Sequence, residues 1–404
     1  MPLARASLRS FLHSAKSTLN NDVKQHSPVT FVIGNESADL DSLCSAVVLA
    51  YLRTYSPFSK SNTVYVPLAN LPRADLSLRP ELLPVLSHAN LKLSDLITLS
   101  DLTKFPHHIP VEQMKWILVD HNALQGELGK IYHSRVVGCI DHHDEEYKVP
   151  WDCDTEPRIV RKSGSCSSLV LEYCKKDWNE LGKQFGEEER AWNAELARLA
   201  IAPVLIDTQN LRDENKTTPT DTKAVRYLEG WIMAAEDGES YKTEDYFNEI
   251  SRAKEDIGSL SLPDILRKDY KQWNESIANL GVSSVVKDVG FLIEKAGSEE
   301  KFFEAVKEFA KQRNLSLFSI MTTSNPDSVF KRELMVWGLD GKGVEAAKTF
   351  SADAEKKLGL AEWQNGALDV ERDSEWRRCW WQKKVENSRK QVAPLLRTSL
   401  TSRG

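Results

Sequence analysis

The chain has 404 residues, of which 41% are apolar and 28% charged, and its formal net charge is −6. This length predicts two domains, and the composition is ordinary for a soluble globular protein. No run of about 18 apolar residues occurs, which excludes a membrane-spanning helix, and the mild acidity gives no general attraction to nucleic acid.

The six cysteines show neither the close pairing of a zinc site nor the density of a disulfide scaffold, so we expect a reduced, intracellular protein. The first 21 residues contain Arg5, Arg9 and Lys16, many serines and no acid, as mitochondrial transit peptides do. We favour instead an amphipathic helix over Leu8–Leu19 that packs on a sheet. A cytoplasmic protein is expected, with mitochondrial import as the alternative.

A first strand is predicted at Val29–Ile33 and a helix at Ser42–Tyr55. The loop between them carries Asp39 and Asp41, two positions apart. Carboxylates at this spacing can flank one cation or bridge two, although acids near a helix start also act as caps. Capping explains one of the two acids, so we expect the pair to bind metal.

Three further apolar runs end in an acid. They are Trp116–Val119 before Asp120, Arg135–Ile140 before Asp141, His142 and His143, and the run from Ala202 before Asp207, which follows a helix predicted at 187–201. We interpret all four runs as strands of one parallel α/β sheet, whose polar ends meet at a single edge. Ligands bind at that edge in such folds.

Other polar positions in the first half are assigned structural roles. Residues 96–99 are predicted to form a short strand, and the Asp101 that follows has no companion group. Serine-rich residues 162–168 open a predicted helix, where backbone N–H groups could bind an anion, but we assign them to capping. Thr220 or Asp221 is expected to cap the helix after the loop NKTTPTD.

Residues 237–246 are rich in Gly, Ser and acids, and we expect them to link a catalytic domain, 1–236, to a C-terminal domain, 247–404. The second part has no acid-tipped strand ends, which suggests a smaller mixed α/β domain. Its predicted strands are 283–294, 315–322 and 332–339, and its predicted helical segments are 262–277, 299–313 and 344–358.

The C-terminal stretch WRRCWWQKKVENSRKQVAPLL contains six basic residues and three tryptophans. Such a stretch can bind nucleic acid, a membrane surface or another polyanion, and the structural alternative is a solvated helix face with buried tryptophans. Arg377, Arg378, Lys383 and Lys384 are therefore candidates for binding a substrate chain.

The acids at the strand ends would repel one another unless cations lay among them, so metals are nearly required. The candidate ligands are Asp39, Asp41, Asp120, His142 and Asp207, with Asn35, Asp141 and His143 close by. This carboxylate-rich set suits Mg²⁺, Mn²⁺ or Co²⁺ better than Zn²⁺. Two such ions, roughly 3.5–4 Å apart, can produce hydroxide and stabilise displacement at phosphorus, which predicts phosphoester or phosphoanhydride hydrolysis.

The segments GNESADLDS, WILVDHN, CIDHHDEE and LIDTQN resemble the four motifs of the DHH phosphoesterase superfamily. The resemblance continues through RKDYKQW and SRKQVAP into the branch with the second type of DHH-associated C-terminal domain. It covers residues 29 to 396 and is strongest to the fungal exopolyphosphatases. It implies a parallel-sheet domain and a smaller mixed domain, with the active site in the cleft between them.

The resemblance also implies residue roles. Asp39 would hold one of two metal ions, Asp41 the other, and Asp120 would bridge them, while His142 and Asp207 would complete the second site. Asp141 would orient an imidazole, and His143 would face the substrate and stabilise or protonate the leaving phosphate. The residues that would bind the substrate phosphates from the second domain are Lys271, Arg389 and Lys390.

Pyrophosphatases of the superfamily have His where this chain has Asn35. An amide oxygen in place of an imidazole nitrogen should weaken a preference for Mn²⁺ or Co²⁺ and make Mg²⁺ acceptable, as in the exopolyphosphatase branch. The intact Asp-His-His argues against the prune-type proteins, which carry Arg at the last position.

We therefore expect an exopolyphosphatase that releases orthophosphate from the ends of inorganic polyphosphate and acts as a monomer, without stable binding to nucleic acid or membrane. The alternative enzyme is a manganese-dependent family II pyrophosphatase or a related phosphodiesterase. Two other classes remain: a non-catalytic polyanion-binding module, which the complete set of carboxylates disfavours, and a nucleic-acid-binding protein, which only the Trp-Arg stretch suggests.

Overall fold

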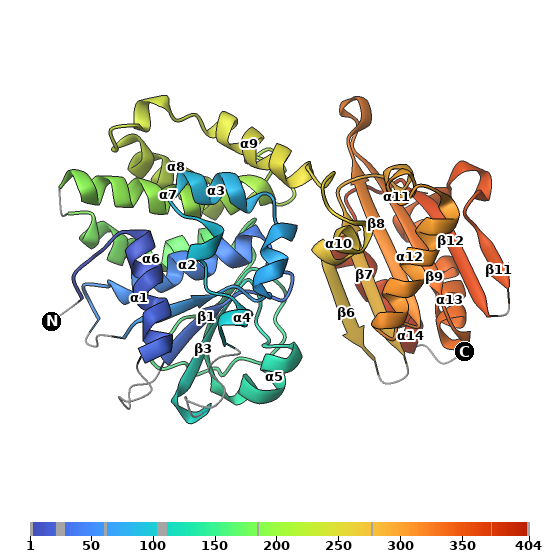
Figure 1. Cartoon of the computed structure of the whole chain (residues 1–404), viewed down its shortest axis with the longest axis horizontal. Coiled ribbons are helices and arrows are strands. Elements are labelled where there is room, and N and C mark those ends of the chain that lie inside the picture. Colours follow the sequence, from blue (N-terminus) through green and yellow to red (C-terminus); the bar gives the residue numbers. More distant parts are fainter. Residues whose placement is uncertain are drawn as a thin grey trace. The chain divides into compact units, whose positions relative to one another are not determined.

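The computed structural model describes residues 3–21, 29–59, 63–102, 111–183, 186–275, 278–372 and 374–401. Contacts between Cα atoms divide the chain into a first unit, Met1–Asp256, and a second unit, Ile257–Gly404. Each unit has its own sheet and its own hydrophobic core (Figure 1).

The first unit is built on a parallel sheet with the strand order β2-β1-β3-β4-β5. Its strands are β1 (Val29–Ile33), β2 (Tyr65–Leu68), β3 (Met114–Val119), β4 (Val136–Asp141) and β5 (Arg158–Val160). All five residues of β1 are buried, as expected for a parallel strand covered on both faces. The parallel α/β sheet predicted from the first three acid-tipped runs is confirmed, and β5 is an additional edge strand.

Helices surround this sheet (Figure 1). They are α1 (Leu8–Asn21), α2 (Leu40–Thr54), α3 (Leu82–His88), α4 (Leu99–Leu102), α5 (Gly126–Tyr132), α6 (Cys166–Leu181), α7 (Glu187–Asp207), α8 (Pro219–Met233) and α9 (Thr243–Glu255). The predicted amphipathic helix near the N-terminus is confirmed as α1, because Leu8, Phe11, Leu12 and Ala15 are all buried in the core that contains the sheet.

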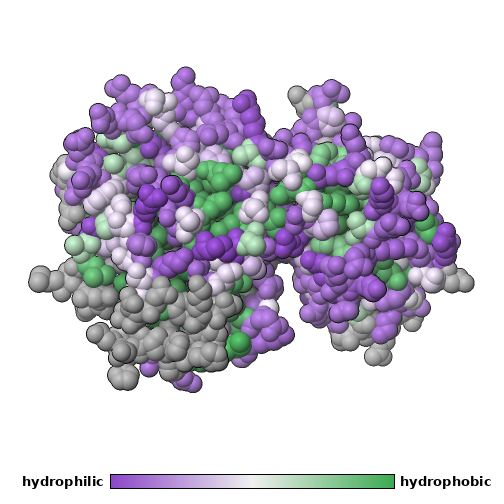
Figure 2. Space-filling model, viewed as in Figure 1, coloured by the Kyte–Doolittle hydropathy of each residue, from purple (hydrophilic) through white to green (hydrophobic). Residues whose placement is uncertain are grey.

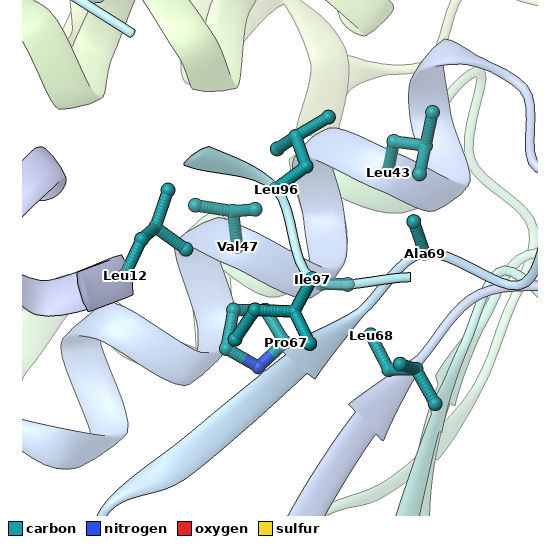
Figure 3. Close-up of a pocket in the computed structure, with 9 residues that line it drawn as sticks. Leu12, Leu43, Val47, Pro67, Leu68, Ala69, Leu96 and Ile97 are labelled. Carbon is teal, nitrogen blue, oxygen red and sulfur yellow. The ribbon is translucent and has the colours of Figure 1, made fainter. Parts of the chain in front are cut away.

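Apolar side chains line a pocket between α1, α2 and β2 (Figure 3). Leu12 comes from α1, Leu43 and Val47 from α2, and Pro67 from β2. The nine lining residues include no polar side chain, so the pocket offers nothing to orient a charged ligand. It belongs to the packing of α1 on the sheet.

The fourth acid-tipped run is not a strand. Residues Glu187–Asp207 form the single helix α7, with Pro203 inside it and almost every residue from Ala194 to Leu205 buried. In a sequence, an apolar run in a buried helix looks the same as an apolar run in a buried strand. Here the run continues the long helix that begins at Glu187. Asp207 therefore lies at the end of a helix.

Other predicted elements also differ from the structure. The predicted strand 283–294 ends at Val285, and Val289–Ala296 form a helix instead. Residues 96–99 form only an isolated bridge, between Ala69 and Thr98, before α4 begins. The predicted helical segment 262–277 splits, in its described part, into a short helix and a strand. The end of the expected linker, 243–246, belongs to α9, which buries Tyr246 and Ile250 in the first core. The division into domains 1–236 and 247–404 stays a prediction.

The second unit has a mixed sheet with the order β10-β12-β9-β8-β7-β6, and β11 pairs with β12. The strands are β6 (Tyr270–Asn274), β7 (Asn279–Val285), β8 (Leu317–Ser324), β9 (Lys331–Gly338), β10 (Leu360–Glu362), β11 (Val370–Arg372) and β12 (Glu375–Gln382). Only β7 and β8 pair in parallel among the pairs described.

Helices cover both faces of the second sheet. They are α10 (Leu262–Lys268), α11 (Val289–Ala296), α12 (Glu299–Gln312), α13 (Gly341–Leu358) and α14 (Arg389–Thr401). Alternate residues of β8 pack into two different cores: Phe318 with the core of α10, α11 and α12, and Leu317 with that of α13 and α14. The predicted mixed α/β domain is confirmed.

Hydrophilic residues cover most of the visible surface of both units, and one apolar area lies over α3, where Leu83 is exposed (Figure 2). Across the described ranges, none of the helices combines the length and the hydropathy needed to cross a bilayer.

Candidate active site and metal centre

The site lies where β1, β3 and β4 end, because the sheet register places these three ends side by side. Ile33 of β1 is the partner of Leu118 in β3, and Val119 is the partner of Ile140 in β4. The residues that follow each strand therefore emerge next to one another. They are Asn35 after β1, Asp120 after β3, and Asp141, His142 and His143 at the end of β4.

Asp120 is the centre of this arrangement. It is buried, and its backbone is in the left-handed region, with φ 62°. One carboxylate oxygen, Oδ2, accepts hydrogen bonds from Asn35 Nδ2 and from Ser42 Oγ, both at 2.8 Å. The other, Oδ1, lies 3.1 Å from His142 Nε2 and 3.7 Å from His143 Nδ1.

These neighbours keep Asp120 ionised. Burial alone would raise the pKa of its carboxyl group, but the hydrogen bond and charge of His142, followed by the charge of His143 and the Ser42 hydroxyl, hold that pKa well below its usual range. Asp120 therefore presents a negative oxygen between two imidazoles.

The two histidines are held differently. The Nδ1 atom of His142 lies 3.0 Å from the carbonyl oxygen of Ser163, to which it must donate, so Nε2 is the atom that faces Asp120. A protonated Nε2 donates to the Asp120 carboxylate, and an Nε2 that has lost this proton can bind a metal ion. The Nδ1 atom of His143 lies 2.8 Å from Asp141 Oδ1. Asp141 thus orients His143, whereas a backbone carbonyl orients His142.

Asp141 is fully buried and organises the turn after β4. It accepts hydrogen bonds from the backbone N–H groups of His142 and His143, and from Asn122 Nδ2 at 2.5 Å. Although burial raises its pKa, the hydrogen bond and charge of His143 and the amide of Asn122 lower it overall. The predicted role of Asp141, orienting an imidazole, agrees with this contact to His143.

Asp41 is buried in the first turn of α2 and points at the start of α6. Its carboxylate accepts hydrogen bonds from the backbone N–H groups of Cys166, at 2.6 Å, and Ser167, at 2.9 Å, and from the Ser165 hydroxyl at 3.0 Å. The N-terminus of α6 does bind an anion, and that anion is the side chain of Asp41. Ser165 also caps α6, as predicted.

The pKa values show that this site concentrates negative charge. Burial, followed by the charges of Asp120 and Asp207, raises the pKa of Asp41 well above its usual range. Burial also raises the pKa of Asp207, with a contribution from Asp120 and against the charges of Lys254 and His142. Asp207 further lies at the C-terminal end of α7, where the helix dipole disfavours an anion.

A divalent cation fits these residues, because it would neutralise the repelling carboxylates and accept the lone pair of His142 Nε2. Among the described residues, one group of three side chains places its ligand atoms all within 4.8 Å of one another. It consists of Asp120, His142 and His143. Asp41 and Asp207 reach this group electrostatically, as their pKa shifts show.

Asp39 and Asn35 are positioned by other contacts. Asp39 is the N-cap of α2, its carboxylate accepting from Ser42 N at 3.0 Å, so the capping alternative accounts for this acid in the structure. The amide oxygen of Asn35 accepts from Ser37 N while its amide nitrogen donates to Asp120. Metal binding by these two residues stays a prediction.

Apart from His143, the predicted substrate-binding residues lie in the second unit. Lys271 is in β6, paired with Val282 of β7. Arg389, the first residue of α14, forms an ion pair of 2.8 Å with Asp269, and the neighbouring Lys390 is exposed. The three basic residues come from two segments of this unit, β6 and the start of α14. Their binding of phosphate stays a prediction.

Two of the further candidates, Arg377 and Arg378, make contacts within the second unit. The guanidinium of Arg377 is buried, with its carbon 3.4 Å from the centre of the Phe303 ring. The prediction that it binds a substrate chain is therefore wrong. Arg378 forms a 2.6 Å ion pair with Glu371, and the exposed Lys383 and Lys384 remain candidates.

The basic aromatic stretch is a strand followed by a helix. Trp376 and Trp380 are buried on β12 and Trp381 is half-buried, so the structural alternative is correct for two of the three tryptophans. The tryptophans lie on a strand, so its prediction of a helix there is wrong.

Sequence reasoning missed a buried arginine beneath the loop after β1. Arg79 donates from Nε to the carbonyl oxygen of Ala38, at 3.0 Å, and from its terminal nitrogen to the carbonyl oxygen of Ser37. It thereby holds the loop that carries Asn35 and the two acids. No motif marks Arg79, because its partners are backbone carbonyls 41 and 42 positions away.

Comparison with known proteins agrees with this geometry. A model of the "DHH family, N-terminal domain" matches residues 29–204, and a model of the "DHHA2 domain" matches residues 248–399. A Schizosaccharomyces pombe protein named "Putative exopolyphosphatase" is 31% identical over 399 residues, which cover 96% of this chain and 97% of that one. The chain belongs to the DHH phosphoesterase family.

Other relatives of this DHH protein are more distant. Mouse "Exopolyphosphatase PRUNE1" is 27% identical over 66% of this chain and 54% of its own length. The "Manganese-dependent inorganic pyrophosphatase" of Methanocaldococcus jannaschii is 23% identical over 72% of this chain and 82% of its own. A crystal structure described as a "Methanococcus jannaschii putative family II inorganic pyrophosphatase" covers 93% of this chain and all of its own, with 20% identity and a TM-score of 0.57, and so supports the fold.

Proposed function

We propose that this DHH protein is an exopolyphosphatase, which hydrolyses the terminal phosphoanhydride bond of inorganic polyphosphate and releases orthophosphate. The observation that carries the proposal is the buried centre in which Asp120 lies between His142 and His143, with the ligand atoms of all three residues within 4.8 Å of one another. Its relation to the S. pombe protein over nearly the whole of both chains supports the same activity.

Two divalent ions, Mg²⁺ or Mn²⁺ with Co²⁺ as a third candidate, are the proposed cofactors. In this proposal the residues that would hold the ions are Asp39, Asp41, Asp120, His142 and Asp207, with Asn35 beside them. When bound, such ions supply a hydroxide nucleophile at neutral pH and stabilise charge on the phosphoryl group. The tautomer of His142, fixed by Ser163, supports its place in this ligand set.

The remaining side chains bind the substrate and move a proton. His143 donates its Nδ1 proton to Asp141, so its Nε2 atom is the one that would face the leaving phosphate. Asp141 holds the imidazole in that orientation. Lys271, Arg389 and Lys390 would bind the phosphates of the chain.

The alternative is a manganese-dependent inorganic pyrophosphatase, and the relationship to the M. jannaschii protein favours it. We prefer the exopolyphosphatase because Asn35 stands where the superfamily's pyrophosphatases carry His. We also propose a cytoplasmic monomer that acts without nucleic acid or membrane, which sedimentation and cell fractionation would test.

The deciding experiment measures orthophosphate release with Mg²⁺ or Mn²⁺ from medium-length polyphosphate, tripolyphosphate and pyrophosphate. The wild-type chain is compared with Asp120→Asn and with Asp101→Asn, which alters a carboxylate outside the site. Preference for the longer chains, lost in Asp120→Asn and kept in Asp101→Asn, would support the proposal. Preference for pyrophosphate with a requirement for Mn²⁺ would move the protein to the pyrophosphatases.

A further inference from the structure

One loop contacts residues from three elements of the metal centre. Residues 163–167, named loop 163–167, comprise the end of the connection from β5 and the first two residues of α6, and they contribute the carbonyl oxygen of Ser163, which orients His142. The same loop contributes the Ser165 hydroxyl and two backbone N–H groups that hold Asp41. The position of this loop therefore decides the position of two proposed ligands that lie on different elements.

The loop also adjoins the third element, the end of α7. A Cβ atom on Gly164 would lie 2.5 Å from Thr208 Cγ2 and 2.8 Å from Asp221 Oδ2. Thr208 is the residue after Asp207, so this close approach requires glycine and brings the loop against the helix end that carries the fourth acid.

Asp221, in the first turn of α8, anchors this loop. It is fully buried, and both of its carboxylate oxygens accept hydrogen bonds. Three donors come from the loop and two from the start of α8. They are Ser163 Oγ at 2.9 Å, Gly164 N at 2.9 Å, Ser165 N at 3.3 Å, Thr218 N at 2.7 Å and Thr218 Oγ1 at 2.7 Å.

The carboxylate is ionised in this environment. Burial raises the pKa of Asp221, but the nearby Ser168 hydroxyl and the hydrogen bonds from Thr218 and Gly164 lower it below its usual range. An asparagine of the same shape would keep one acceptor oxygen and turn its NH₂ group toward N–H donors. Asp221→Asn therefore breaks hydrogen bonds that anchor the loop, with little change in side-chain volume.

We propose that Asp221 is a positioning residue of the metal centre: through loop 163–167 it fixes His142 and Asp41 in the arrangement that binds a divalent cation. The proposal rests on the proposed metal site and adds to it a residue that itself touches no ligand of the ion.

The chain contains a matched control. Asp101 also closes a Thr-x-x-Asp capping arrangement, accepting from Thr98 N at 2.9 Å and Thr98 Oγ1 at 3.0 Å, as Asp221 does from Thr218. Its other partners are Arg73 and Lys16. Asp101→Asn therefore removes a comparable cap and ion pairs but leaves loop 163–167 intact.

The experiment measures the binding of Mn²⁺ to the full chain, from the free Mn²⁺ signal in electron paramagnetic resonance and by titration calorimetry. We compare the wild type with Asp221→Asn, Asp101→Asn and the milder Ser163→Ala, which removes one donor to Asp221. Asp221→Asn should raise the dissociation constant of Mn²⁺ roughly 10- to 100-fold, as loss of a partner behind a ligand does, and Ser163→Ala should raise it less. Asp101→Asn should leave it unchanged.

Orthophosphate release provides a second readout. Because the ligands themselves remain, excess Mn²⁺ should restore the rate of Asp221→Asn toward that of the wild type, with the main change in the Mn²⁺ concentration needed for half activity. If Asp221→Asn does not fold by circular dichroism, Ser163→Ala carries the comparison.

Wild-type Mn²⁺ affinity in both Asp221→Asn and Ser163→Ala, or an equal loss in Asp101→Asn, would overturn the positioning role and leave the proposed function in place. Failure of the wild-type chain to bind Mn²⁺ or Mg²⁺ would instead overturn the proposed metal site, and this inference with it.

Discussion

Three of the proposed ligands are held by different kinds of contact. Asp120 is held by an amide and a hydroxyl, Asp41 by the start of a helix, and His142 by a backbone carbonyl. Such contacts set the orientation and the protonation state of a ligand before a metal arrives. The chemistry of the centre therefore depends on residues that a motif does not include.

A substitution of Asn35 tests which divalent metal ion the centre prefers. We expect Asn35→His to raise activity with Mn²⁺ or Co²⁺ relative to Mg²⁺ several-fold, because imidazole nitrogen prefers later divalent metals more than an amide oxygen does. The measurement is orthophosphate release at saturating concentrations of each metal. An unchanged ratio would show that Asn35 only orients Asp120, as its present hydrogen bond allows.

Asp101 predicts a pH dependence of stability that is separate from the site. Burial alone would raise its pKa, but hydrogen bonds from Thr98, Arg73 and Lys16 lower it to about 2. A carboxyl group whose pKa is lowered on folding stabilises the fold above its unfolded pKa of about 3.9, and this contribution disappears as the pH falls toward 2.

Asp101→Asn should therefore lower the free energy of unfolding by about 1 kcal/mol at pH 7, a usual cost for a lost cap. The difference between variant and wild type should shrink as the pH is lowered from 5 through 3. Urea unfolding at a series of pH values measures it, and a difference that stayed constant with pH would contradict the assignment.

At the scale of elements, the ends of β1, β3 and β4 bring the motifs together, and the starts of α2 and α6 receive the acids. The motifs meet because the parallel register places the three strand ends at the same edge of the sheet. The end of α7 then supplies Asp207 from a different kind of element.

Arg79 stabilises the loop after β1, so a substitution of Arg79 should weaken metal binding. We expect Arg79→Met to weaken Mn²⁺ binding about tenfold, because the carbonyl groups of Ser37 and Ala38 lose their buried donor and the loop relaxes. Ala38 has φ 44°, a conformation that needs such support. Mn²⁺ titration measures the effect.

The control is Arg73→Met, which removes the guanidinium that binds the carbonyls of Leu93 and Leu96 and the Asp101 carboxylate. Equal losses of Mn²⁺ affinity in the two variants would mean that general destabilisation, and not the loop, is responsible.

A substitution at the start of α14 tests whether this helix binds polyphosphate. Lys390→Ala should raise the Michaelis constant for polyphosphate at least several-fold with a smaller change in kcat, because an exposed ammonium contributes to binding the chain. Lys390 is preferable to Arg389 for this purpose, since Arg389 also pairs with Asp269. Lys301→Ala, at an exposed position of α12 in the same unit, is the control.

At the scale of the whole molecule, the proposed metal ligands all belong to the first unit and the proposed phosphate-binding cations to the second. The first unit gathers acids at one sheet edge, and the second carries the basic residues of β6 and α14. The two units therefore have different responses to metal.

Saturating Mn²⁺ should stabilise the first unit and leave the second nearly unchanged. At a free concentration of 100 times the dissociation constant, the linkage is worth about 2.7 kcal/mol. Hydrogen–deuterium exchange should show protection at residues 34–42, 119–122, 141–146 and 163–167, and Asp120→Asn should abolish it. Protection spread evenly over both units would contradict a metal centre confined to the first.

By itself, the sequence determined the parallel sheet, the acids at its edge and the need for cations, because buried strands read as apolar runs and their ends as polar motifs. It also predicted the amphipathic helix Leu8–Leu19, which corresponds to α1. These features are local, so pattern and period are sufficient to predict them.

The tertiary structure decided what depends on contacts between distant residues. It showed that the run before Asp207 is a helix, that Arg377 is buried against Phe303, and that the start of α6 holds Asp41. Asp221 reads in the sequence only as a helix cap, yet it binds a loop 56 to 58 residues away. Such partners leave no periodic signal in the sequence, because backbone groups at distant positions look alike until the fold brings them together.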